Sequence, residues 1–257
     1  MTIGTGETEL RRIHGFLSDF TRRQAERTAD FPGGFAALDD TYALSRGNNH
    51  VLVDGEPDPE ALPALVDEAM AHLPHRTVHI PDATVAKACA EPLARAGYTC
   101  RTLVVMRHDG PVPELGGARE VGLPDLREPL TESLRRLVPD IRDDVLRVLV
   151  ERRETRRRGA DDVRFLASHD EFGQVASWAD LYIDPATGIA QIEDLVTAEA
   201  HLGQGHAGVV LDTALRTAAE AGCTTVFLIA LADDWPRHWY ARRGFVPVGE
   251  IHTFEQA

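Results

Sequence analysis

The sequence predicts an α/β protein with a mixed sheet, built from two copies of one fold in tandem. Two observations carry this prediction. First, apolar stretches with the periods of strands and of helices alternate along the chain. Second, one order of elements (strand, helix, strand, helix, glycine–aromatic pair, strand) describes both Val51–Met106 and Ile192–Ile251. Chance alternation in an α/β chain is the alternative explanation of the second observation.

Composition sets the class of protein. The chain has 257 residues, 43% of them hydrophobic, which is enough for one large or two small domains with real cores. Its net charge of −14 argues against a nucleic-acid or anionic-membrane partner and is compatible with a cationic amine substrate. No apolar run is long enough to span a membrane, and the first ten residues lack the apolar segment of a signal peptide. Cys89, Cys100 and Cys223 are typical of reduced core cysteines, so we expect a cytoplasmic monomer or homodimer.

The first domain is predicted to cover residues 1–112. Pro32-Gly33-Gly34 breaks the chain after the first helix, and His108–Gly117, rich in proline and glycine, is a linker to the second domain. The expected helices are Leu10–Arg27, Pro59–Leu73 and Thr84–Ala96, and the expected strands are His50–Val53, Thr77–Ile80 and Cys100–Met106.

The second domain is predicted to cover residues 113–257. It opens with two helices at Pro124–Leu137 and Asp140–Arg157, and strands follow at Val163–Ala167, Gly173–Tyr182 and Ile189–Thr197.

The basic run Arg152–Gly159 has two explanations. It could be a solvated helix C-terminus, where cations suit the helix dipole and Gly159 ends the helix. The alternative is an anion site, such as one for a phosphate of a cofactor. We favour the solvated helix end. The eleven histidines are dispersed without ligand spacing, so we expect no metal site.

A glycine-rich turn lies directly before an apolar helix near the C-terminus. It reads Gly203-Gln204-Gly205-His206-Ala207, and a Tyr-x-x-x-Gly-Phe ending follows at Tyr240–Phe245. A glycine turn that opens a helix presents unpaired backbone N–H groups and the positive end of the helix dipole. Such a site suits a phosphate-bearing ligand, although a tight turn with close packing is an equally good explanation of the glycines alone.

The ordered set resembles the GNAT superfamily of acyl-CoA-dependent N-acyltransferases. That family has Arg/Gln-x-x-Gly-x-Gly/Ala after its fourth strand, and here the stretch is Leu202-Gly203-Gln204-Gly205-His206-Ala207. Leu202 departs from the Arg or Gln of the family. The family's ending, Tyr-x-x-x-Gly-Phe, is intact. The resemblance is strong over about the last ninety residues and implies two GNAT-like domains, of which the C-terminal one is complete.

The resemblance implies acetyl-CoA as co-substrate and a set of residues that bind it. In the family, the strand before the glycine turn splays from its neighbour, and its backbone holds the pantetheine. By position, the strand residues are Leu195, Val196 and Thr197. The turn from Gly203 through Gln204, Gly205 and His206 to Ala207 would hold the pyrophosphate, and Asp233 stands where an Asn often touches the cofactor.

The resemblance also implies an acid and a base. Tyr240 would protonate the CoA sulfur, with a packing tyrosine as the alternative. Glu193 is our candidate base, acting directly or through water, and a salt-bridged strand residue is the alternative. Asp194 is adjacent and, by strand alternation, is expected on the opposite face. Trp178 and Trp239 could line an acceptor pocket, but buried core tryptophans are the commoner case.

The first domain has lost these features. Gly55-Glu56-Pro57-Asp58-Pro59 stands in place of the glycine turn, where prolines remove N–H donors and carboxylates repel phosphate, and Leu93 stands in place of Tyr240. Mycothiol synthase is a family member with such a tandem arrangement. We therefore expect an N-acetyltransferase that moves an acetyl group from acetyl-CoA to a primary amine of a small molecule or peptide. A non-catalytic CoA-binding or regulatory protein is the alternative.

Overall fold

A computed structural model describes residues 3–256 of the chain, which form two compact units. Unit 1 contains Met1–Met106 and Ile229–Ala257, and unit 2 contains Arg107–Leu228. Unit 1 takes residues from both ends of the chain, because the last strand pairs with a strand of the N-terminal part. Of the first ten residues, which lack the apolar segment of a signal peptide, residues 1 and 2 lie outside the described range.

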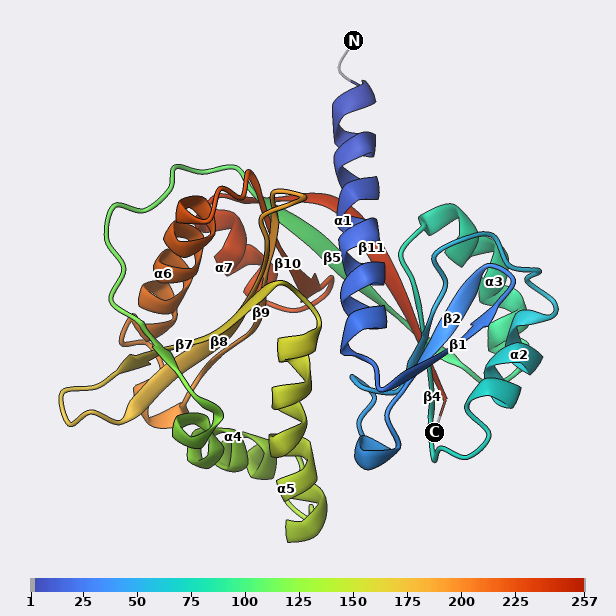
Figure 1. The fold of residues 1–257 in the computed structure, drawn as a ribbon, viewed down its shortest axis with the longest axis horizontal. Helices are drawn as coiled ribbons and strands as arrows, with labels where there is room; N and C mark the ends of the chain where they lie inside the picture. The colour runs from blue at the N-terminus through green and yellow to red at the C-terminus, as the bar shows by residue number, and fades with distance from the viewer. Residues whose placement is uncertain (1–2, 257) are drawn as a thin grey trace. The chain divides into compact units, whose positions relative to one another are not determined.

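Unit 1 is a sheet with helices. Its strand order is β1-β2-β3-β4-β11-β5, and β3 and β4 run parallel while β11 is antiparallel to β4. The C-terminal strand thus lies between two strands of the N-terminal half (Figure 1). The elements are α1 (Ile3–Gln24), β1 (Arg27–Phe31), β2 (Gly34–Leu38), η1 (Asp40–Tyr42), β3 (His50–Leu52), α2 (Leu62–Ala69), β4 (Arg76–Ile80), α3 (Ala83–Arg95), β5 (Thr99–His108), α7 (Pro236–Arg242) and β11 (Phe245–Gln256).

The break predicted at Pro32-Gly33-Gly34 is the turn of a β-hairpin. Strands β1 and β2 pair antiparallel on either side of it, with Phe31 opposite Gly34. Gly33 has a φ of 88°, which few residues other than glycine adopt. The predicted helix Leu10–Arg27 therefore ends too late, because its last residue belongs to β1.

Unit 2 contains the remaining strands, with helices on both sides of them. Its strand order is β10-β9-β8-β7-β6, with β9 parallel to β10 and the other pairs antiparallel. Figure 1 shows α6 on one side of β7, β8 and β9, and α4 with α5 on the other. The elements are β6 (Arg119–Val121), α4 (Leu123–Leu137), α5 (Asp143–Glu151), η2 (Arg152–Arg158), β7 (Asp162–His169), β8 (Val175–Asp184), β9 (Ile189–Thr197), η3 (Glu199–His201), α6 (His206–Glu220) and β10 (Thr225–Leu231), whose last residues belong to unit 1.

Two predicted segments of unit 2 differ in detail. The helix predicted over Asp140–Arg157 is α5 followed by the 3₁₀ helix η2. The predicted linker is held against α6, because the N–H groups of Gly117 and Ala118 donate to Thr213 Oγ1 at 3.0 and 3.1 Å. A Cβ at Gly116 would lie 2.6 Å from the same oxygen, so the glycine permits this close approach.

The predicted α/β class with a mixed sheet is confirmed, and most predicted strands and helices are present within a few residues of their expected ends. Among the described residues, no helix is both long and apolar enough to cross a membrane.

Candidate functional site

Strand β9 contains a bulge at the candidate base. The register with β8 moves from Asp180 opposite Glu193 to Trp178 opposite Val196. Two residues of β9, Asp194 and Leu195, therefore face a single residue of β8. Asp194 has a φ of 50°, and among described non-glycine residues it alone has a positive φ. Such bulges re-aim side chains and recur beside active sites.

Strand β9 pairs with its parallel neighbour β10 over its first residues. The pairing within unit 2 runs from Ile189 opposite Thr225 to Ile192 opposite Leu228. The candidate cofactor residues Leu195, Val196 and Thr197 lie beyond this last pair. On the other edge of β9, Ser177 of β8 donates from its hydroxyl to the Val196 carbonyl at 2.7 Å, and the Thr197 hydroxyl donates to Ser177 Oγ at 3.2 Å.

The glycine turn leads from β9 through η3 into α6. Gly203 and Gly205 have φ values of 74° and 90°, and Gly205 is the N-cap of α6. A Cβ at either glycine would meet nothing within 4 Å. The positive φ, and not a lack of space, is therefore what favours glycine at these two positions. The N–H groups of His206 and Ala207 open the helix and have no acceptor within it. The Gln204 side chain turns back and donates to the Ala200 carbonyl at 2.9 Å.

A buried ion network lies beside Glu193. Asp180 is fully buried on β8 and accepts hydrogen bonds from Arg153 and Arg156 of η2. Arg156 also pairs with the Asp194 carboxylate at 2.7 Å, and Arg153 lies 3.7 Å from it. The Tyr182 hydroxyl donates to Asp180 at 3.2 Å. One pair of arginines thus holds a buried carboxylate of β8 and the bulge residue of β9.

These arginines correct the interpretation of the basic run as a solvated helix end. Arg153 and Arg156 are 5% and 9% exposed, and their guanidinium groups face the sheet. The physical reason is the buried Asp180, whose charge needs paired cations in the protein interior. Because those guanidinium groups are bound to carboxylates, the alternative of an anion site receives no support from them.

The network shifts the pKa values of the two adjacent carboxyl groups in opposite directions. Burial, together with the negative charge of Asp194, raises the pKa of Glu193 to about 7. The charge of Arg156 and a 2.7 Å hydrogen bond donated by the Gln191 amide lower this pKa, but by less. For Asp194, burial would raise the pKa, but the charges of Arg156, Arg153 and Arg152 outweigh it and lower the pKa far below its ordinary value. A carboxyl group with a pKa near 7 can take a proton at neutral pH.

The expectation that Glu193 and Asp194 point to opposite faces is wrong. Glu193 lies opposite Asp180 in the strand pairing, and Asp180 and Asp194 both bind Arg156. The two carboxylates therefore lie on one side of the sheet, because the bulge interrupts the alternation of side chains along β9.

The two remaining predicted residues belong to unit 1. Tyr240 is half-buried on α7, with its ring 5.2 Å from that of Trp239 and 5.8 Å from that of Phe245. Asp233 is exposed between β10 and α7. Arg243 lies over the Trp239 ring, so Trp239 is part of a surface cluster of aromatic and cationic side chains on this helix.

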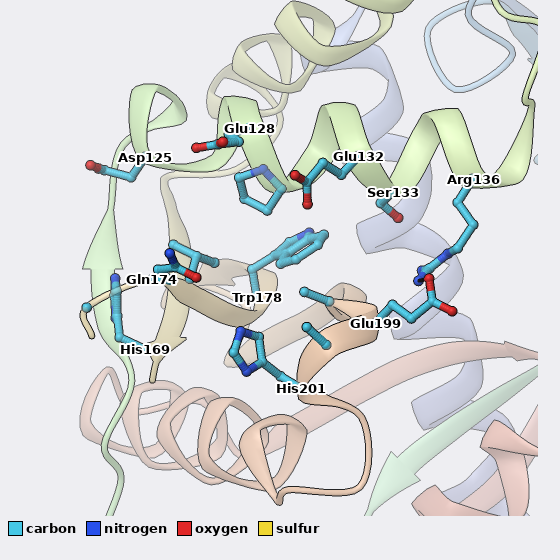
Figure 2. Close-up of a pocket in the computed structure, with 15 residues that line it drawn as sticks. Asp125, Glu128, Glu132, Ser133, Arg136, His169, Gln174, Trp178, Glu199 and His201 are labelled. Atoms are coloured by element: carbon cyan, nitrogen blue, oxygen red, sulfur yellow. Dashed lines mark hydrogen bonds and ion pairs between the residues drawn. The ribbon is translucent and has the colours of Figure 1, made fainter. Parts of the chain in front are cut away.

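Two cavities of unit 2 adjoin Trp178. The larger, about 840 Å³, lies between α4, the β7–β8 turn and η3. Figure 2 shows Trp178 in its centre, with Glu128 and Glu132 of α4 on one side and His201 on the other. The smaller, about 210 Å³, is lined by leucines and valines of α4, α5 and β9, by Asp194, and by Arg152, Arg153 and Arg156 of η2. Trp178 is 1% exposed and forms part of both walls.

Sequence reasoning missed Asp180 and the two arginines. Asp180 is the only charged residue in the run from Val175 to Ile183. That signal, together with arginines three residues apart at 153 and 156, could have indicated a buried ion pair. Within residues 3–256, no group of three or more His, Cys, Asp or Glu side chains is arranged to hold a metal ion.

Comparison with known proteins gives a family match for part of the chain. Residues 127–245 match the family described as Acetyltransferase (GNAT) family. The comparison with curated proteins finds no match.

Several solved structures share the fold. One is a functionally unknown conserved protein from Staphylococcus epidermidis ATCC 12228, with a TM-score of 0.65 and 13% identity over 89% of this chain and 92% of that chain. Another is a GCN5-related N-acetyltransferase from Kribbella flavida, with a TM-score of 0.61 and 17% identity over 96% and 95%. A third is a GCN5-related N-acetyltransferase from Sphaerobacter thermophilus, with a TM-score of 0.56 and 16% identity over 87% and 76%. The GNAT resemblance is thus confirmed over residues 127–245, and most of the chain has the fold of these structures.

Proposed function

We propose that this chain is a GNAT N-acetyltransferase that moves an acetyl group from acetyl-CoA to a primary amine. The observation that carries the proposal is the position of Glu193. Its carboxyl group, with a pKa of about 7, lies at the bulge of β9, where that strand leaves β10 and leads into the glycine turn. The family match over residues 127–245 supports the reaction class.

The turn and the splayed strand fit acetyl-CoA as a substrate. Gly203 and Gly205 hold the turn in positive-φ conformations with open space beside them, so backbone N–H groups at the start of α6 can approach a pyrophosphate. Beyond Ile192, the edge of β9 that faced β10 has no strand partner in unit 2. The backbone of Leu195, Val196 and Thr197 on that edge would bind the pantetheine arm and the thioester carbonyl.

Glu193 would act as the general base. An alkylamine with a pKa near ~10.4 is an ammonium at neutral pH and must lose a proton before its nitrogen can attack. Glu193 accepts that proton, directly or through water. The nitrogen then forms a bond to the carbonyl carbon of the thioester, the C–S bond breaks, and the products are an amide and the free thiol of CoA. Asp194, paired with Arg156, stays ionised and is the weaker candidate for the base.

Tyr240 would give a proton to the departing sulfur. The support for this role is the Tyr240-x-x-x-Gly244-Phe245 ending and the position of Tyr240 on the helix before β11. Asp233 would contact the cofactor in place of the Asn of the family.

Unit 1 would contain a second GNAT-like copy without a cofactor. Its β3 and β4 are parallel and joined by α2, as β9 and β10 are parallel and joined by α6. Gly97 and Gly244, with φ values of 90° and 86°, open the corresponding strands β5 and β11. The loop in place of the glycine turn is packed against the β1–β2 hairpin, where a Cβ at Gly33 would lie 2.3 Å from Pro57 N. This packing supports a structural role for that loop.

A non-catalytic CoA-binding or regulatory protein is the second candidate. Leu202 favours it, because it is 59% exposed where the family has Arg or Gln beside the phosphates.

Thiol release distinguishes the two candidates. The chain would be incubated with acetyl-CoA and a mixed panel of primary amines, and free CoA thiol and acetylated products would be measured by a thiol reagent and by mass spectrometry. Acetyl-CoA binding in calorimetry without amine-dependent thiol release would support the non-catalytic protein. Thiol release that Gly205→Asp abolishes would support the acetyltransferase.

A further inference from the structure

The 840 Å³ cavity of unit 2 carries more negative than positive charge. Asp125, Glu128 and Glu132 of α4 and Glu199 of η3 line it, and Arg136 is the one arginine or lysine in its lining. Arg136 is already paired with Glu199 at 3.3 Å. The Asp125 carboxylate accepts from the Gly122 N–H at 2.9 Å and caps α4.

Glu128 and Glu132 remain as the carboxylates of the cavity without a described partner. They are one helical turn apart, and like charges at this spacing destabilise a helix. Figure 2 shows both side chains on the face of α4 that overlies Trp178. A cation bound between them would relieve the repulsion.

The indole of Trp178 gives an independent observation. Its Nε1–H is buried and has no hydrogen-bond partner in the described structure, although buried indole N–H groups usually find one. Trp178 lies between α4 and His201 in the middle of the lining residues (Figure 2). An oxygen atom of a ligand that reached this donor would satisfy it.

The larger cavity adjoins the smaller one, which reaches β9 at the residue after the candidate base; Glu193 itself lines neither cavity. The larger and the smaller cavity share Ser133 and Trp178 in their walls, and the smaller one is also lined by Asp194 and Val196 of β9. Methylene groups of a ligand suit the part of the smaller cavity formed by Leu130, Leu134 and Leu149. Its other wall contains Arg152, Arg153 and Arg156, and the last two are paired with Asp180 and Asp194.

We propose that the two cavities bind the amine acceptor, and that this acceptor is a small dication with a carbonyl or hydroxyl oxygen. One ammonium group lies between Glu128 and Glu132, the oxygen accepts from Trp178 Nε1, and the reacting amine points along the smaller cavity toward β9. This inference rests on the proposed function for the reacting amine, whereas the charge and oxygen recognition can be tested by binding alone.

Three matched probes test the recognition. Lysinamide has two ammonium groups and a carbonyl, norleucinamide lacks the second ammonium, and cadaverine lacks the carbonyl. Calorimetry without acetyl-CoA should show the tightest binding for lysinamide. Loss of the second charge should weaken binding on the order of tenfold, and loss of the carbonyl by about threefold to tenfold. The affinity for lysinamide should fall as salt is added.

Variants assign the contacts. Glu128→Gln combined with Glu132→Gln should lower the affinity for lysinamide to that for norleucinamide. The matched control, Glu114→Gln combined with Glu220→Gln, removes two exposed carboxylates of unit 2 outside the cavity and should leave the affinity unchanged. Trp178→Phe removes the indole N–H. It should weaken the binding of lysinamide but not the binding of cadaverine. If that variant unfolds, the Trp178 indole proton resonance of the wild-type chain should move downfield with lysinamide and not with cadaverine.

The outcomes separate this inference from the proposed function. Equal affinity for lysinamide and norleucinamide, or no effect of the Glu128 and Glu132 substitutions, overturns the dication site even if amines are acetylated. Tight and specific lysinamide binding without thiol release keeps the site and counts against the acetyltransferase.

Discussion

Glu193 and Asp194 are consecutive residues of β9 whose carboxyl pKa values are shifted in opposite directions. The bulge at Asp194 brings its carboxylate within 2.7 Å of Arg156, and the resulting ion pair lowers the pKa of Asp194. The fixed negative charge of Asp194 then adds to burial in raising the pKa of Glu193 to about 7. At neutral pH, Asp194 is thus ionised, while Glu193 has a pKa close to the pH of its surroundings.

The first prediction concerns the pH dependence of acetyl transfer. A base must be deprotonated to accept a proton, so kcat/KM should rise as the pH increases through about 7 and level off above it. Glu193→Gln should remove this rise and lower kcat by about 10² to 10⁴. The control Glu171→Gln changes an exposed glutamate in the β7–β8 turn and should keep the wild-type profile. An unchanged profile in Glu193→Gln would assign the base elsewhere.

The second prediction concerns Asp194 as the source of part of the shift. Asp194→Asn removes a negative charge near Glu193 and leaves Arg156 freer to stabilise the ionised form. Both effects favour the carboxylate, so the rising limb of the pH profile should move to lower pH by roughly one unit. A carbon-13 titration of the Glu193 carboxyl group measures the same shift without turnover. A limb that stays near pH 7 would mean that burial alone sets the pKa of Glu193.

Periodicity in the sequence was sufficient to predict most elements around this site but not the bulge. The apolar pattern of Ile189–Thr197 predicts a regular strand, and regular alternation places adjacent residues on opposite faces. The bulge depends on the register with β8, where Ala179 alone faces two residues of β9. Such a register comes from pairing between strands, which a single strand's pattern does not encode.

The buried arginines were missed for a related reason. Arg153 and Arg156 belong to a run of charges that resembles a solvated helix end, and local composition favours that interpretation. Their burial is decided by Asp180, which is more than twenty positions away in sequence and fully buried on β8. The glycine turn was predictable, in contrast, because positive-φ glycines before a helix are a local feature.

The third prediction separates backbone strain from ligand binding at the glycine turn. Gly205 and Gly222 lie just outside the two ends of α6, with φ values of 90° and 83°, and a Cβ at either would meet nothing within 4 Å. Alanine at either position should therefore cost a similar strain, about 1–2 kcal/mol of unfolding free energy. Only Gly205→Ala should weaken the binding of acetyl-CoA, because it disturbs the N–H groups at the start of the helix. The affinity measured by calorimetry should fall by about tenfold or more. Equal affinities in the two variants would exclude the turn as the pyrophosphate site.

The fourth prediction concerns Tyr240 as the acid. Tyr240→Phe keeps the ring and its contacts with Trp239 and Phe245 and removes only the hydroxyl. Folding and acetyl-CoA affinity should change little, while kcat should fall by about 10² to 10⁴ because the departing sulfur loses its proton donor.

The leaving group provides the control for this prediction. A thioester whose thiol is more acidic than CoA needs the proton less, so the loss in Tyr240→Phe should be smaller with that substrate. Stopped-flow measurement with an amine for which chemistry limits turnover keeps product release from masking the effect. If Tyr240→Phe turns over at the wild-type rate under these conditions, the hydroxyl takes no part in the reaction, and the ring contacts of Tyr240 on α7 account for the residue.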